Sequence, residues 1–217
     1  ISITGRLMAR LMEAAGATQV LTMTLHSPQV HGFFDVPTDA LTARPVFKDY
    51  FRKQDLTGAI VVAPDTGHAQ PAGRFADDLG LPMAAANKTR VSDTEVRISG
   101  LIGDLRGCRR AILYDDEIAS GTSIRAVSAL LAEQGIEQIT VVCTHGIFSA
   151  NALPRLAAVP QITEIVTTDT VPVAESKRIP QLQILSVAPL FGEAIRRNLL
   201  RETIGDLFAF WAEFKPD

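Results

Sequence analysis

Apolar and polar residues along this chain form short apolar runs that alternate with segments of helical periodicity. Short apolar runs predict buried strands, and apolar residues that recur every three or four positions predict amphipathic helices. The predicted strands cover residues 20–25, 59–63, 82–86, 110–114, 139–143, 164–167 and 182–187, and the predicted helices cover 3–15, 69–79, 123–134, 151–158 and 189–200. Strands alternating with helices predict an α/β fold, with a parallel sheet and helices on both of its faces.

Two segments show neither periodicity. Residues 26–45 predict a long irregular connection in which Phe33 and Phe34 are buried. Residues 91–108 are polar and mixed, and they predict a flexible loop with a hairpin around 95–102.

Polar side chains gather where the predicted strands end. These residues are His26, Asp65, Lys88, Asp115 and Asp116. In open parallel sheets, ligands bind outside the carboxyl ends of the strands. We therefore expect these five side chains to lie along one edge of the sheet and to form a binding site there.

The stretch from residue 111 to residue 124 carries the most specific chemistry. A predicted strand ends in Asp115 and Asp116, and the loop of small residues at 119–123 leads into a predicted helix. The amino end of a helix presents backbone N–H groups to an anion. Ser120, Thr122 and Ser123 add hydroxyl donors to this loop, and Gly121 permits close backbone approach.

The acidic pair cannot bind the same anion, because like charges repel. Carboxylates suit the hydroxyls of a polyol, or a metal ion. A phosphate cradle beside an acidic pair is what a sugar phosphate requires. The alternative is an ordinary strand–loop–helix turn with a capping serine, since short motifs also occur by chance.

Composition narrows the class of protein. The chain has 217 residues, of which 47% are hydrophobic and 21% charged, with a net charge of −3. These values are typical of a globular protein and give no electrostatic basis for binding nucleic acid or an anionic membrane. Cys108 and Cys143 are too few for a disulfide framework. No apolar run is long enough for a membrane span, and no signal peptide is apparent, so we expect a cytoplasmic protein.

Several segments in a fixed order resemble the ribose-phosphate diphosphokinase family, also called phosphoribosyl diphosphate synthetase. The matching segments are Thr-Leu-His-Ser-Pro-Gln at 24–29, Gly-Phe-Phe-Asp-Val-Pro at 32–37, Pro-Asp-Thr-Gly at 64–67, Lys-Thr-Arg at 88–90, Ile-Gly-Asp at 102–104, the stretch at 111–124, Thr-His-Gly-Ile-Phe-Ser at 144–149 and Ser-Val-Ala-Pro-Leu at 186–190. Together they are far more specific than any one loop.

The resemblance implies transfer of the diphosphoryl group of MgATP to the C1 hydroxyl of ribose 5-phosphate. It implies Mg²⁺ as cofactor, ATP and ribose 5-phosphate as partners, and a homo-oligomer built from dimers, in some members a hexamer. It also implies two similar domains with phosphoribosyltransferase-like sheets. Residues 44–187 would be the ribose-phosphate-binding domain, and 1–43 with 188–217 packed against them would be the remnant of an incomplete first domain.

Residue roles follow only from matching positions in the family. His26 and Asp65 match magnesium-associated positions, and Lys88 matches a catalytic lysine on a mobile loop. Arg90 matches a residue that contacts the ribose phosphate and assists catalysis.

The acidic pair and the loop after it match the site for the sugar phosphate. By resemblance, Asp115 contacts the ribose, Asp116 belongs to the same site, and residues 119–123 hold the 5-phosphate. The resemblance assigns no such role to His31, His68 or His145, which we expect to be structural.

The chain also departs from the family pattern. Ala119 and Thr122 stand where the phosphate loop commonly has Asp and a second Gly, and His68 stands where a second Gly often follows Gly67. The chain opens without Met, inside a predicted helix. Either the protein is processed, or the sequence lacks a native amino-terminal part. The resemblance implies a preceding segment that holds adenine and ATP, which is absent from these 217 residues.

Two other functions share parts of this pattern. A phosphoribosyltransferase shares the acidic pair and the loop but consumes phosphoribosyl diphosphate. The segments at 25–29 and 88–90 favour the synthetase over it. A non-catalytic, regulatory relative of the synthetase would keep the fold; Ala119 favours that alternative, whereas retention of His26, Asp65, Lys88 and both aspartates opposes it.

Overall fold

The computed structural model describes residues 3–90 and 96–207. The chain divides into two compact units. One runs Arg44–Ser186, and the other comprises the chain up to Ala43 together with the chain from Val187 onward. No helix within the described ranges is both long enough and apolar enough to cross a membrane.

The unit Arg44–Ser186 is built on a seven-stranded sheet of order β5-β4-β3-β6-β7-β8-β9. Its strands are β3 (Ala59–Ala63), β4 (Met83–Arg90), β5 (Val96–Ile102), β6 (Arg110–Ile118), β7 (Gln138–Gly146), β8 (Ile162–Thr168) and β9 (Leu182–Leu185). Neighbouring strands pair in parallel, except β4 and β5, which pair antiparallel. The sheet is therefore parallel with one antiparallel edge strand.

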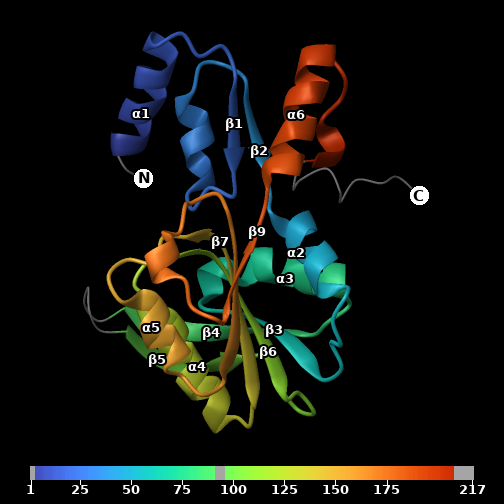
Figure 1. Cartoon of the computed structure of the whole chain (residues 1–217). Coiled ribbons are helices and arrows are strands. Elements are labelled where there is room, and N and C mark those ends of the chain that lie inside the picture. The colour runs from blue at the N-terminus through green and yellow to red at the C-terminus, as the bar shows by residue number, and fades with distance from the viewer. Residues whose placement is uncertain (1–2, 91–95, 208–217) are drawn as a thin grey trace. The chain divides into compact units, whose positions relative to one another are not determined.

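Helices cover both faces of this sheet. They are α2 (Arg44–Phe51), α3 (Ala69–Leu79), α4 (Thr122–Glu133) and α5 (Ala152–Ala157), with short 3-10 turns η2 (Thr66–His68) and η3 (Glu175–Lys177). Figure 1 shows α4 and α5 on one side of the strands and α2 and α3 on the other. Successive side chains of β6 point to opposite faces of the sheet and pack against the helices on each side. Leu113 belongs to the core under α4 and α5, whereas Tyr114 stacks on Phe75 of α3, with 4.6 Å between ring centroids.

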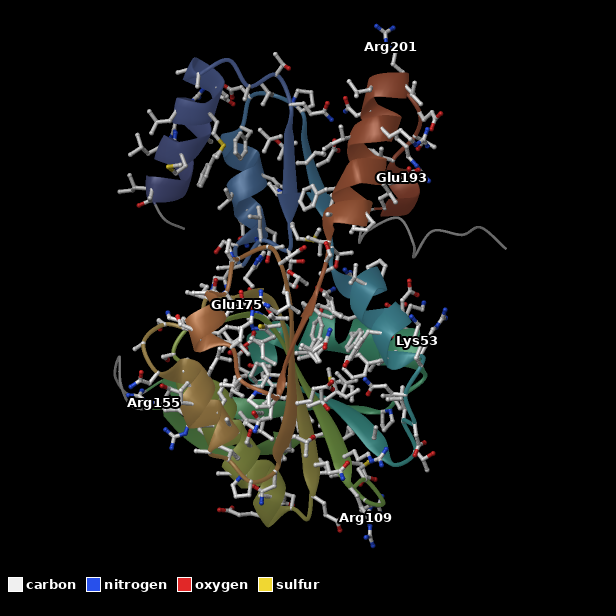
Figure 2. All side chains as sticks on the ribbon, in the orientation of Figure 1. Lys53, Arg109, Arg155, Glu175, Glu193 and Arg201 are labelled. Atoms are coloured by element: carbon white, nitrogen blue, oxygen red, sulfur yellow. The ribbon has the colours of Figure 1, made fainter. Side chains whose placement is uncertain are left out.

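The central strands are buried because their sequences are apolar on both faces. All five residues of β3 are buried, as expected for a strand covered by helices on both sides. Several charged side chains of this unit lie at its surface. Figure 2 shows Lys53, Arg109 and Arg155 projecting away from this unit.

The other unit contains a two-stranded parallel sheet of β1 (Val20–Met23) and β2 (Thr38–Leu41). Its helices are α1 (Ile3–Ala14) and α6 (Ala188–Leu200), with 3-10 turns η1 (Pro28–Phe33) and η4 (Gly205–Leu207). The side-chain amide of Asn198 donates to Gln19, which ties α6 to the residue before β1. Leu7, Met8, Leu11 and Met12 of α1 are exposed.

The α/β class and the parallel sheet are confirmed, but residues 26–45 were predicted wrongly. Instead of one irregular connection they contain η1, β2 and the start of α2. Phe33 and Phe34 are half-buried rather than buried. β2 was missed because Thr-Asp-Ala-Leu carries no apolar alternation; it forms by pairing with β1, from Val20 opposite Thr38 to Met23 opposite Leu41.

Several strands are also longer than predicted. β6 extends past Tyr114 to Ile118, and β7 extends past Cys143 to Gly146, because the two strands go on pairing as far as Ile118 and Gly146. β4 extends past Ala86 to Arg90 by pairing with β5. The hairpin predicted around 95–102 is wrong, because residues 96–102 form the single strand β5, which pairs antiparallel with β4. Residues 91–95 of the predicted flexible loop lie outside the described residues.

Candidate functional site

The acidic pair lies within β6 rather than after its end, which corrects the sequence-based expectation. Both side chains are largely buried: those of Asp115 and Asp116 are 13% and 11% exposed. Each accepts a hydrogen bond from the next backbone N–H. Oδ1 of Asp115 accepts from the N–H of Asp116 at 2.9 Å, and Oδ1 of Asp116 accepts from the N–H of Glu117 at 2.7 Å. Each carboxylate is therefore hydrogen-bonded to the strand that carries it.

Asp65 comes from the neighbouring strand β3, at the same edge of the sheet. It begins the turn η2, where its Oδ1 accepts a hydrogen bond from the backbone N–H of His68 at 3.1 Å. Such a bond satisfies one of the N–H groups that lack a partner at the start of a helical turn. The turn leads directly into α3 at Ala69.

The ring of His68 joins Asp65 to the acidic pair. Nδ1 of His68 lies 3.3 Å from Oδ1 of Asp65. Its Nε2 lies 3.1 Å from Oδ1 of Asp116 and 3.6 Å from Oδ1 of Asp115. One imidazole thus contacts a carboxylate that follows β3 and two carboxylates within the adjacent strand β6.

The charges at this cluster shift one another's pKa values. The pKa of His68 rises to about 10, because its ring hydrogen bonds to Asp116 and to Asp65 stabilise the imidazolium. The pKa of Asp115 also rises, and burial is the main cause, since desolvation disfavours the carboxylate. The imidazolium opposes that rise in the pKa of Asp115.

The loop at 119–123 follows β6 and begins α4. Gly121 has φ +72°, in the left-handed region that favours glycine, and α4 starts at the next residue. The hydroxyls of Ser120 and Thr122 lie 3.1 Å apart on the exposed side of the loop. The amino end of a helix carries partial positive charge, so an anion is stabilised at this position.

The segment after β7 holds this loop in place. The backbone N–H of Phe148 donates to the carbonyl of Ile118 at 3.0 Å, and that of Ser149 donates to the carbonyl of Ala119 at 3.0 Å. A Cβ at Gly121 would lie 3.2 Å from the side chain of Leu156 in α5. The backbone of the loop is therefore held by the segment after β7, while the hydroxyls of Ser120 and Thr122 are exposed to solvent.

Lys88 and Arg90 lie on β4 itself, not in a loop after a strand as the sequence suggested. β4 pairs with β3 as far as Ala63 opposite Ala85, and then continues in pairing with β5. The side chains of Lys88 and Arg90 lie outside the described part of the chain. Their expected roles therefore stay predictions.

His26 does not share this sheet. It follows β1, which pairs with β2 in the other unit. The expectation that five polar residues line one edge of one sheet was therefore wrong for His26. The structure brings Asp65, Asp115 and Asp116 together at adjacent strand ends, linked through His68.

The sequence analysis expected a structural role for His68 and did not predict its contacts with Asp65 and the acidic pair. The signal was present, because His68 follows Asp65 by three residues just after a strand, and this spacing places both on one side of a helical turn. His145, also expected to be structural, is held by a hydrogen bond between Nδ1 and the hydroxyl of Thr170 at 2.9 Å.

Comparison with known proteins places the chain in a family. Residues 95–209 match the model of the phosphoribosyl synthetase-associated domain. A Streptomyces coelicolor protein that carries the provisional name ribose-phosphate pyrophosphokinase is 49% identical, over 96% of this chain and 65% of its own length. The ribose-phosphate pyrophosphokinase of Clostridium acetobutylicum is 42% identical, over 90% of this chain and 61% of its own length.

A solved structure agrees with these sequence matches. The phosphoribosylpyrophosphate synthetase of Mycobacterium smegmatis superposes with a TM-score of 0.83 at 36% identity, covering 93% of this chain and 65% of that one. The chain spans less than two thirds of the length of each of these three relatives. By its sequence and its fold, the chain belongs to the ribose-phosphate pyrophosphokinase, or phosphoribosyl diphosphate synthetase, family.

Proposed function

We propose that the protein containing this chain transfers the diphosphoryl group of MgATP to the C1 hydroxyl of ribose 5-phosphate, giving phosphoribosyl diphosphate and AMP. One observation carries the proposal. A buried acidic pair on β6 and a hydroxyl-bearing loop at the start of α4 lie within a few residues of each other. A sugar phosphate needs this combination, since its hydroxyls donate to carboxylates and its phosphate accepts from the loop.

Each part of the substrate has a group of matching chemistry in this unit. Asp115 and Asp116 accept hydrogen bonds from the ribose hydroxyls. Residues 119–123 hold the 5-phosphate, through the hydroxyls of Ser120, Thr122 and Ser123 and through backbone N–H groups. Gly121 and Ala119 keep the loop free of side chains that would obstruct the phosphate.

Lys88 and Arg90 supply positive charge in this proposal. Diphosphoryl transfer needs little covalent catalysis but much neutralisation of charge on the polyphosphate. Lys88 stabilises charge that develops on the transferred phosphates, and Arg90 contacts the ribose phosphate and assists the transfer. The pairing of β4 beside β3 supports these roles, because β4 continues from the sheet edge where Asp65 lies.

The family implies a magnesium ion, and the donor set in this unit suits one. Mg²⁺ prefers oxygen ligands, and Asp65 offers a carboxylate at a strand end, 29% exposed. Within this unit, Asp65 would be associated with the ion; by the resemblance, His26 matches the family's other magnesium-associated position. When bound, Mg²⁺ neutralises charge on the phosphates of ATP. Asp65 also accepts a hydrogen bond from the backbone N–H of His68 and so stabilises the turn η2, with or without the ion.

Membership of the family supports the wider assignments. The unit Arg44–Ser186 is the ribose-phosphate-binding domain, and the remaining chain belongs to the first domain. The enzyme is a cytoplasmic homo-oligomer built from dimers, with ATP and ribose 5-phosphate as its substrates and without nucleic-acid or membrane partners.

A test of the reaction is release of AMP from ATP in the presence of Mg²⁺. The proposal predicts AMP release that requires ribose 5-phosphate, with one phosphoribosyl diphosphate formed for each AMP. A phosphoribosyltransferase would instead consume phosphoribosyl diphosphate with a base and release diphosphate. Two results would contradict the proposal. One is AMP release at the same rate with and without ribose 5-phosphate, and the other is binding of ribose 5-phosphate by the intact protein without any turnover.

A further inference from the structure

His68 is the side chain that connects the two strands of the acidic site. Its ring contacts Asp65 after β3 at 3.3 Å and Asp116 within β6 at 3.1 Å. A third carboxylate, that of Asp115, lies 3.6 Å from Nε2. The side chain of His68 is only 20% exposed, so this contact is shielded from water.

The position of His68 is itself fixed by the chain. Its backbone N–H donates to Asp65, and its ring returns to the same carboxylate oxygen. The next residue, Ala69, begins the eleven-residue helix α3. A ring held at both its backbone and its Nδ1 presents Nε2 to the acidic pair in one orientation.

The orientation of the two carboxylates depends on a hydrogen-bond donor from outside β6. Within their own strand, the carboxylate of Asp115 accepts a hydrogen bond from the backbone N–H of Asp116, and that of Asp116 accepts one from the N–H of Glu117. These bonds do not prevent two adjacent, mostly buried carboxylates from repelling each other. A donor reaching from η2 offsets that repulsion and limits rotation of the Asp116 side chain.

We propose that His68 is a positioning residue that holds Asp115 and Asp116 in the orientation that receives the ribose hydroxyls. The identity of the ligand rests on the proposed function. The effect of His68 on the orientation of the two carboxylates does not depend on that ligand. By the resemblance, His68 stands where the family often has a glycine, which has no side chain to bridge the two strands.

The decisive variant is His68→Gly, which removes the ring and leaves space for added imidazole. We expect its Kd for ribose 5-phosphate to rise roughly tenfold or more, since hydrogen bonds to charged groups are worth about 1.5–3 kcal/mol. Added imidazole should restore part of the affinity, and His68→Gln, which keeps a donor, should lose less. The kcat of the intact enzyme at saturating ribose 5-phosphate should change much less than the KM.

Gln70→Ala is the matched control, because Gln70 is exposed in the same segment, two residues further on. It should behave like the wild type. Crystal structures of the His68→Gly variant, with and without imidazole, give a readout that needs no sugar phosphate. We expect the carboxylate of Asp116 to rotate without imidazole and to return with it.

Two results would overturn the role of His68. One is an unchanged Kd in a folded His68→Gly variant. The other is an Asp116 carboxylate that keeps its orientation in the crystal of that variant. If the wild-type protein fails to bind ribose 5-phosphate, the proposed function fails, and the crystal comparison still decides the role of His68.

Discussion

The Nε2 atom of His68 lies 3.1 Å from Oδ1 of Asp116, although the two residues are 48 positions apart in the sequence. His68 belongs to the turn η2, and Asp116 belongs to the strand β6. The turn η2 after β3 is thereby joined to β6, the strand that leads into the loop at 119–123. A contact between a cation and a mostly buried carboxylate influences both the stability of the fold and its dependence on pH.

The first prediction concerns that pH dependence in metal-free buffer. The pKa of His68 rises from 6.5 to about 10 in the folded protein. The folded state therefore binds more protons than the unfolded state between these values, and the stabilisation is complete below pH 6.5 and lost as pH rises through 10. Each pKa unit corresponds to about 1.4 kcal/mol, so the loss is on the order of a few kcal/mol.

Denaturant unfolding of the wild type and of His68→Gln from pH 7 to 10 measures this effect. The difference in unfolding free energy between the two proteins should shrink as pH rises. Comparing the two proteins cancels the lysines and tyrosines that titrate in the same range. A difference that stays constant across the series would show that His68 is not held as an imidazolium.

The second prediction tests the loop through Gly121→Ala. Gly121 has φ +72°, and an added Cβ would lie 3.2 Å from Leu156. An alanine in the left-handed region costs roughly 1–2 kcal/mol. We expect a destabilised protein that also binds ribose 5-phosphate more weakly, because the loop must shift to accommodate the new methyl group.

Gly135→Ala separates strain from function. Gly135 has φ +88°, and a Cβ there would meet no atom within 4 Å. It lies in the turn after α4, at the opposite end of that helix from the loop. This variant should lose comparable stability and keep its affinity for ribose 5-phosphate. Equal losses of affinity in both variants would indicate that global stability, not loop geometry, controls binding.

Much of the fold could be predicted because its strands are short apolar runs. β3 was predicted with its exact bounds, Ala59–Ala63, since it is buried on both faces. The prediction failed where pairing, not local sequence, defines an element. β6 continues through Asp115 and Asp116 because β7 pairs with it there, and no hydrophobic pattern marks that extension.

The candidate site shows the same division. The stretch around Asp115 and the loop at 119–123 was recognisable because all its parts are adjacent in the sequence. The bridge from His68 to Asp116 was not, because it depends on the lateral order of β3 and β6 in the sheet. A histidine three residues after Asp65 was visible, but its partner on β6 could not be known from spacing alone.

The third prediction concerns Lys88, whose role follows from the family. Lys88→Ala should lower kcat far more than it changes the affinity for ribose 5-phosphate, since the ammonium acts on charge that develops in the transition state. Lys53→Ala is the control, because Lys53 projects from the surface just after α2 (Figure 2). Normal turnover in Lys88→Ala, combined with weakened sugar-phosphate binding, would refute this role.

The fourth prediction is that Asp115→Asn weakens binding of ribose 5-phosphate without unfolding the protein. Charge-assisted hydrogen bonds from sugar hydroxyls are worth roughly 1.5–3 kcal/mol each, and an amide accepts them less strongly. Asp55→Asn is the matched control; Asp55 is exposed and pairs with Arg110, at the start of β6. Equal affinities of the wild type and Asp115→Asn in calorimetric titration would count against contact with the ribose.

The most direct test of the central claim is to locate ribose 5-phosphate on the protein by NMR. Backbone amide resonances are assigned, and ribose 5-phosphate is titrated with inorganic phosphate as a parallel ligand. The account predicts the largest shifts from ribose 5-phosphate at residues 115–123, with phosphate alone affecting mainly 119–123. Shifts confined to other parts of the chain, or saturable binding that leaves 115–123 unchanged, would contradict it.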